Sequence, residues 1–186
     1  HQFIAKMVET VPHPEVIPAS GGLMWRRSWR RRHATEPEAH QELVVLAGIQ
    51  GSASYLIDGV VHEIRRGTVL WALAGQQHFL LSESAEFDMW VALVSSRIIT
   101  ADADMPPHRI SDICATPPPR ILSPAASDML HKIAVAQAAS TTVATKAAGL
   151  RLWLAHATRA ALRGARRSGV LACASVATAV DASAVG

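Results

Sequence analysis

Cysteine is scarce in this chain of 186 residues, which contains only Cys114 and Cys173. The two lie far apart, without a CxxC pair or a Cys/His spacing, which argues against a disulfide framework and against a zinc finger. A reducing cytoplasm therefore fits best. No apolar run reaches the roughly 18 residues that a membrane-spanning helix needs. Three prolines interrupt residues 11–19, so we expect no signal peptide at the N-terminus.

Charge of one sign is also limited, because the formal net charge is only +3. A charge this small does not by itself indicate a nucleic-acid binder, and we interpret the basic runs as solvated faces. The first run alternates with Trp25 and Trp29, a mixture that single-stranded nucleic-acid sites also use. Direct nucleic-acid binding, or an anionic effector beside these arginines, is the alternative. The two runs are Arg26, Arg27, Arg30, Arg31 and Arg32, and then Arg159, Arg163, Arg166 and Arg167.

The chain changes character at Pro117–Pro119. Before this break, short runs rich in Val, Ile and Leu are separated by Gly, and after it Ala, Leu and Arg dominate. Asp58-Gly59 lies between two of the runs and is typical of a type I′ hairpin turn, because Gly adopts positive φ at low cost. Short strands at this spacing favour a sandwich or a barrel. The expected strands are Leu23–Arg31, Glu42–Ala47, Ala53–Ile57, Val60–Ile64, Val69–Leu73, His78–Ser82 and Phe87–Val94.

The two faces of the first expected strand, Leu23–Arg31, should carry different side chains. Because side chains alternate along a strand, Trp25 and Arg27 would share one face and Arg26 would lie on the other.

Two helices are expected after the proline break, forming an antiparallel helical hairpin. Ser123-Pro124 opens the first, because Ser is a good N-cap and Pro suits the first turn. The second runs from about Thr142 to Arg167 and carries an apolar stripe at three- and four-residue intervals. The predicted domains are a barrel over 1–116, a hairpin over 117–168 and a tail over 169–186 without an assigned structure. The stripe consists of Leu150, Trp153, Leu154, Ala157 and Ala161.

The strongest local pattern for chemistry runs from Gly67 to His78, where two glycine turns flank a strand and a histidine opens the next one. Upstream, His40 and Glu42 are two residues apart and would share a face of one strand. If the barrel brings these strands together, two imidazoles and a carboxylate converge, a donor set that suits Fe(II), Mn(II), Ni(II) or Zn(II). The competing interpretation makes His40 and Glu42 exposed rim residues and His78 a hydrogen-bonded histidine at the barrel mouth.

The stretch from Gly67 to Ser82 resembles a motif of the cupin family. That motif has the form Gly, five residues, Pro, one residue, Gly, two residues, His, three residues, Asn. Here Gly67, Gly75 and His78 keep the spacing, while Leu73 stands in place of Pro and Ser82 in place of Asn. The resemblance implies a jelly-roll β-barrel.

The first cupin motif is less complete in this chain. The His-x-His pair of the family, followed by Glu, is reduced to His40-Gln41-Glu42. Because one metal-binding histidine is absent, we expect no cofactor and no enzyme activity. A divalent metal held by His40, Glu42 and His78, with dioxygenase or isomerase chemistry, is the rival hypothesis.

A wider resemblance joins the barrel to the helical half. Gly67–Trp71, Gly75–His78, Ser84–Val91 and Gly149-Leu150 ahead of a long helix are similar to the N-terminal half of AraC-type transcription regulators. In that bacterial family a cupin barrel senses a small effector, a helical hairpin dimerises the protein, and two helix-turn-helix units bind DNA. Too few residues follow Arg167 for two such units, so we expect the DNA-binding half to be absent here.

The resemblance therefore implies a non-enzymatic sensor and dimerisation domain. Its expected partners are a second copy of the chain, a small-molecule effector, and DNA only through the absent domain, with no membrane. The expected effector pocket contains His40, Glu42, Tyr55, Trp71 and His78. The expected dimer seam, with packing of the same stripe against the barrel as the alternative, consists of Leu150, Trp153, Leu154 and Ala157.

Overall fold

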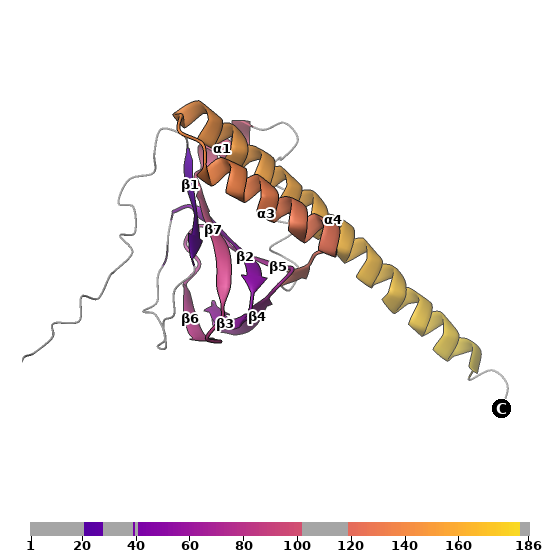
Figure 1. Cartoon of the computed structure of the whole chain (residues 1–186). Coiled ribbons are helices and arrows are strands. Elements are labelled where there is room, and N and C mark those ends of the chain that lie inside the picture. Colours follow the sequence, from indigo (N-terminus) through magenta and orange to yellow (C-terminus); the bar gives the residue numbers. More distant parts are fainter. Residues whose placement is uncertain (1–20, 28–38, 40, 102–118, 183–186) are drawn as a thin grey trace, which may run out of the picture.

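The computed structural model describes residues 21–27, 39, 41–101 and 119–182, and in the last helix it describes side chains as far as Arg163. In this part, two antiparallel sheets face each other and helices cover one of them (Figure 1). The larger sheet has the order β1-β7-β2-β5-β8 and the smaller sheet the order β4-β3-β6. The predicted fold class, mainly β with C-terminal helices, is confirmed.

All seven predicted strands are present, with small shifts at their ends. Residues 28–31 of the first predicted strand lie outside the described residues. The observed strands are β1 (Gly22–Arg27), β2 (Leu43–Gln50), β3 (Ser52–Ile57), β4 (Val60–Arg65), β5 (Thr68–Ala72), β6 (His78–Glu83), β7 (Asp88–Val94) and β8 (Arg120–Ile121).

The two sheets enclose an apolar core. Because side chains alternate along a strand, β5 directs Leu70 and Ala72 into this core and Val69 and Trp71 to the opposite face, toward the helices. The larger sheet is thus covered on both faces, which explains why β2 and β7 are almost continuously apolar. The inter-sheet core consists of Val44, Leu46, Ala53, Tyr55, Ile57, Ile64, Leu70, Ala72, Leu80, Phe87, Met89, Val91 and Leu93.

The turn between β3 and β4 forms as its sequence predicts. Asp58 and Gly59 have φ angles of 46° and 82°, the left-handed values that a type I′ turn needs at both central positions. The loop before β6 is tied to this turn, because the Asp58 N–H donates to the Gln77 carbonyl at 3.0 Å and the Gln77 N–H donates to Asp58 Oδ1 at 3.1 Å. These bonds hold His78, the first residue of β6, at the end of the smaller sheet.

The helices are α1 (Ser96–Ala101), α3 (Pro124–Ala138) and α4 (Val143–Ala182). Ser123 caps α3 as predicted, and its Oγ accepts a hydrogen bond from the Ala126 N–H at 3.3 Å. The hairpin of α3 and α4 lies on the outer face of the larger sheet, and α4 continues well beyond the barrel (Figure 1). No helix in the described ranges is both long and apolar enough to cross a membrane.

Two boundaries differ from the prediction. The second helix was expected to end near Arg167, whereas α4 continues to Ala182, through most of the predicted tail. This stretch is rich in alanine and has no proline, so it sustains a helix although its apolar periodicity is poor. In addition, β8 (Arg120–Ile121) pairs with β5 although it lies within the segment assigned to the hairpin. The barrel sheet therefore includes chain beyond residue 116.

The apolar stripe of α4 is buried within the chain. Leu150 is 1% exposed, and Trp153, Leu154 and Ala157 are each 0% exposed. They pack with Trp71 and other residues in one core between the hairpin and the larger sheet. Side chains buried this fully in one chain offer no surface to a second copy, so the predicted dimer seam on this stripe is wrong. The alternative interpretation, packing against the barrel, is what the structure shows.

Gly149 lies where α4 passes close to α3. A Cβ at this position would lie 2.8 Å from Cγ and 2.9 Å from Cβ of Gln137, whose side chain is buried. Those atoms are close to the α3 backbone, so the helix itself would have to shift. Gly149→Ala is therefore expected to destabilise the fold by about 1–3 kcal/mol, although Ala is favoured over Gly in a helix interior by about 1 kcal/mol.

Urea unfolding tests this expectation, with Ala136, the exposed neighbour of Gln137 on α3, as the control. Ala136→Gly changes helix propensity without touching the crossing and is expected to cost no more than about 1 kcal/mol. A Gly149→Ala variant more stable than the wild type would mean that the crossing has room for a methyl group.

Candidate functional site

The structure places the predicted pocket residues in different parts of the fold. His40 lies outside the described residues, and Glu42 is half-buried immediately before β2. Tyr55 faces the core between the sheets from β3, whereas Trp71 faces the helices from β5. Tyr55 and Trp71 therefore do not line a common pocket.

His78 begins β6 and is buried, at 6% exposure, on the interior side of the smaller sheet opposite Ile57. Its Nδ1 lies 3.0 Å from the Gln76 carbonyl oxygen. A carbonyl only accepts, so Nδ1 carries the proton in this bond. Within the part of the chain that the structure describes, no three His, Cys, Asp or Glu side chains gather as a metal site. Because His40 lies outside the described residues, the predicted metal set of His40, Glu42 and His78 stays a prediction.

A polar group lies enclosed between the two sheets, formed by Arg27 of β1, Tyr55 of β3 and Glu83 of β6. Arg27 Nη1 donates to Tyr55 Oη at 3.0 Å, and Arg27 Nη2 donates to Glu83 Oε2 at 3.0 Å. The Arg27 and Glu83 side chains are 11% and 3% exposed, so this is a largely buried ion pair. Tyr55 Oη in turn lies 3.9 Å from Met89 Sδ. We call these three side chains the interior polar group.

The two consecutive arginines of β1 point to opposite faces of the sheet. Trp25 packs on the inter-sheet core and Arg27 reaches Tyr55 there, which confirms the predicted alternation. On the other face, Arg26 Nε donates to Asp88 Oδ2 at 2.8 Å, and its Nη2 contacts the same oxygen. That hydrogen bond raises the pKa of Arg26 against the lowering effect of partial burial. Each arginine thus has its own carboxylate.

Glu83 was not predicted as a site residue, because a β-bulge turns its side chain inward. In the pairing of β6 with β3, Glu83 lies opposite Ala53, but Leu80 lies opposite Tyr55, with a register shift between. The extra residue on β6 reverses the alternation, so that Leu80 and Glu83 both face the interior. Regular alternation from His78 would instead put Glu83 outside. No turn or spacing signal in the sequence marks this bulge.

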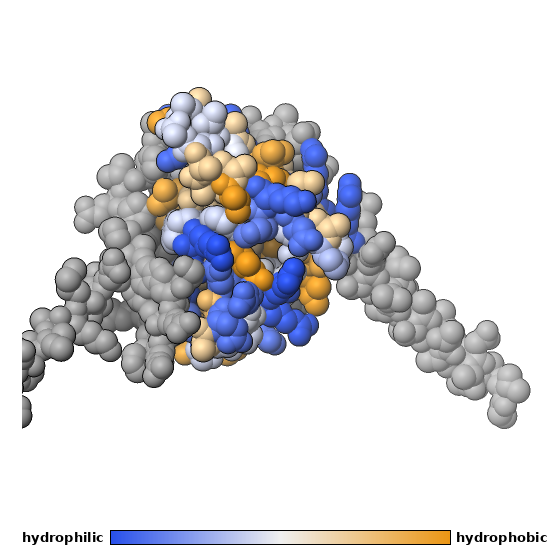
Figure 2. Space-filling model, viewed as in Figure 1, coloured by the Kyte–Doolittle hydropathy of each residue, from blue (hydrophilic) through white to orange (hydrophobic). Residues whose placement is uncertain are grey.

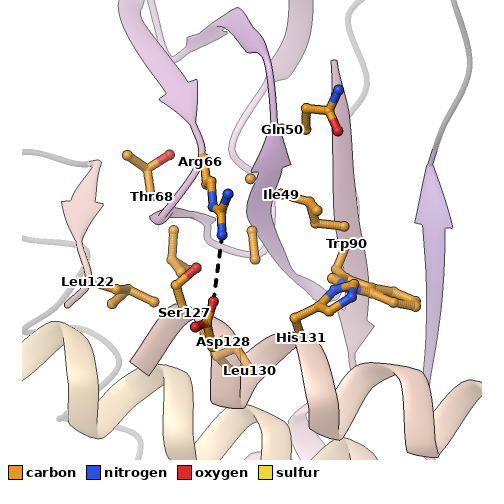
Figure 3. A pocket seen from close by; sticks show the side chains of 13 residues that line it. Ile49, Gln50, Arg66, Thr68, Trp90, Leu122, Ser127, Asp128, Leu130 and His131 are labelled. Atoms are coloured by element: carbon orange, nitrogen blue, oxygen red, sulfur yellow. Dashed lines mark hydrogen bonds and ion pairs between the residues drawn. The ribbon is translucent and has the colours of Figure 1, made fainter. Parts of the chain in front are cut away.

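A separate pocket of about 200 Å³ lies between the outer face of the larger sheet and α3. Two polar contacts connect its walls. Trp90 Nε1 donates to His131 Nδ1 at 3.0 Å, and Arg66 Nη2 lies 3.8 Å from Asp128 Oδ1. Figure 3 shows Arg66 reaching from the turn before β5 toward Asp128 on α3, with His131 beside the Trp90 ring. We call this space the α3 pocket.

The fold consists of two facing antiparallel sheets, with a helical hairpin packed on the larger one. Residues 23–150, more than half of the chain, match the family model described as the AraC-like ligand binding domain. The chain therefore belongs to the family of AraC-like ligand-binding domains. None of the curated proteins compared with the chain matches its sequence.

Several solved structures resemble parts of the chain at low similarity. KdgF from Halomonas sp. aligns with a TM-score of 0.39 and 13% identity, over 44% of this chain and 76% of its own. A Cupin 2 conserved barrel domain protein from Salinispora arenicola aligns with a TM-score of 0.38 and 18% identity, over 48% and 75%. A mutant of Bacillus subtilis oxalate decarboxylase OxdC aligns with a TM-score of 0.37 and 15% identity, over 41% of this chain and only 22% of its own. Similarity of this extent carries no argument about function.

Proposed function

We propose that this chain is the sensor and dimerisation part of a transcription regulator, with a small-molecule effector bound between the two sheets. The observation that carries the proposal is the interior polar group, enclosed in the barrel of a chain that belongs to the AraC-like ligand-binding family. A few polar side chains among apolar walls are what small-molecule sites use to orient a ligand. In this proposal the chain carries out no reaction, and DNA is bound by a further domain.

The chemistry of the interior polar group favours a neutral polar effector. Arg27 offers N–H donors, Glu83 offers acceptors, and the Tyr55 hydroxyl offers both. The positive and negative charges already balance each other at 3.0 Å, so an ionic ligand would leave one buried charge without its partner, which is costly. A ligand with several hydroxyl or amide groups would bind without that cost.

The exposed face of α4 is the surface we propose for dimerisation. Ala144, Ala148 and Leu152 are exposed and follow each other at four-residue intervals, and Leu152 is 60% exposed. Small residues at this spacing let two helices approach closely, and Leu152 supplies the apolar contact. Figure 2 shows hydrophobic residues in small groups among polar ones on the face of the molecule that it draws. A dimer would hold two DNA-binding halves over paired half-sites.

Sedimentation equilibrium tests the dimer. The wild type is expected to associate at micromolar concentration, and Leu152→Glu is expected to weaken the dimer at least about tenfold, because it places a charge in an apolar contact. Val61→Glu on β4 is the matched control, since Val61 is similarly exposed at 58% but lies away from the hairpin. A wild type that stays monomeric, or an equal loss in both variants, would refute dimerisation through α4.

A further inference from the structure

The contact between the hairpin and the larger sheet changes character along α3. Under α4 the layer is closed by fully buried side chains such as Trp153 and Leu154. At the first turns of α3, by contrast, the sheet and the helix are separated by the α3 pocket. The two walls are joined there by polar contacts from Trp90 to His131 and from Arg66 to Asp128 (Figure 3).

The α3 pocket combines an apolar floor with two opposite charges at its rim. Ile49, Val69 and Leu130 line it beside the Trp90 ring. At the rim, the Arg66 and Asp128 side chains are 76% and 60% exposed and 3.8 Å apart. A close charge-assisted hydrogen bond measures about 2.7–2.9 Å, and exposed pairs of this length are weak. Both charged groups are therefore available to a ligand.

We propose that the α3 pocket binds a small zwitterion with an apolar side chain, the chemistry of a free aliphatic α-amino acid. Its carboxylate pairs with Arg66, its ammonium group pairs with Asp128, and its side chain lies over the apolar floor. The pocket has a volume of about 200 Å³. That is below the about 300–1,000 Å³ of sites for larger ligands, so the ligand must be small.

This site is distinct from the effector site proposed between the sheets. One charged partner, Arg66, belongs to the barrel, and the other, Asp128, belongs to α3. A zwitterion that pairs with both would link the hairpin to the barrel more firmly than their direct contact does. Because α3 packs on α4, occupancy of the α3 pocket would make the position of α4 sensitive to this ligand.

Calorimetric titration of the whole chain with L-leucine tests the proposal. Binding is expected at millimolar concentration or below, with a shift of the Trp90 indole N–H resonance, which a Trp90→Phe variant identifies. Isocaproate lacks the ammonium group and isoamylamine lacks the carboxylate, and each is expected to bind at least about tenfold more weakly than leucine.

Two variants locate the ligand. Arg66→Gln and Asp128→Asn are both exposed substitutions that leave the core intact, and each is expected to weaken leucine binding about three- to tenfold. Arg65→Gln and Glu63→Gln are the matched controls, because they are exposed neighbours that do not line the pocket. The controls are expected to bind as the wild type does.

Three outcomes would overturn the proposal. The first is no heat and no indole shift at millimolar leucine. The second is equal binding of leucine and isoamylamine, which would show that the carboxylate plays no part. The third is binding that Arg66→Gln leaves unchanged but Tyr55→Phe abolishes, which would place the ligand between the sheets and leave the proposed effector site standing.

Discussion

Replacing Trp153 with alanine is expected to lower the free energy of unfolding by about 3–5 kcal/mol. Trp153 is 0% exposed and lies in the core that joins the hairpin to the larger sheet. Its loss would leave a large cavity in that layer, which the surrounding strands and helices cannot fill. Since domains of this size are stable by only about 5–15 kcal/mol, the variant should unfold at much lower urea concentration.

Two further variants separate packing from polarity at this position. Arg151→Ala changes a nearby exposed residue of α4 outside the proposed dimer contact and is expected to alter stability by no more than about 0.5 kcal/mol. Trp153 Nε1 is buried and meets no acceptor among the described residues. Trp153→Phe keeps most of the ring and removes this unpaired donor, so it should cost less than about 1.5 kcal/mol. Equal small losses in Trp153→Ala and Arg151→Ala would contradict the role of this layer.

The second large effect is expected at the interior polar group. Arg27→Met should cost about 3–5 kcal/mol, because it removes the guanidinium that pairs at 3.0 Å with the Glu83 carboxylate, whose side chain is 3% exposed. The double variant Arg27→Met, Glu83→Gln removes both charges and should recover to within about 1 kcal/mol of the wild type. Unfolding by urea, followed by circular dichroism at one protein concentration, measures all three proteins.

The same double variant tests the proposed effector site. It is expected to keep the fold, so that a loss of binding cannot be attributed to unfolding. A neutral polyol or amide that raises the melting temperature of the wild type by binding should no longer raise that of the double variant. If the double variant were as unstable as Arg27→Met alone, the ion pair would not account for the cost of the single change.

Much of the fold could be predicted because its signals are local. Asp58-Gly59 forms the expected turn, since two residues with positive φ are enough to define it. Ser123 forms the expected cap, since its side chain bonds an N–H three residues away. The resemblance to AraC-type regulators was likewise carried by glycines and a histidine within short stretches of chain, and the family match over residues 23–150 confirms it.

The candidate site was less predictable, because its residues depend on pairing between distant strands. The apolar stripe with Trp153 indicates burial, but its period does not say whether a sheet or a second chain covers it. Trp71 and Tyr55 were expected together, although strand alternation in two different sheets turns them to different cores. The α3 pocket could not be predicted at all, since its charged partners come from a turn and a helix far apart in the chain.

The strands β1 to β7, the Asp58-Gly59 turn and the start of α3 in this protein follow from residues a few positions apart, so the amino-acid order alone predicted them. The contact between Glu83 and Arg27, by contrast, does not follow from local sequence. These two residues are 56 positions apart, and a bulge in one strand, visible only once the strands are paired, brings them together. Both proposed binding sites depend on the packing of distant segments. The packed sheets enclose the charges of the interior polar group, and the packing of α3 on the larger sheet leaves the α3 pocket between them.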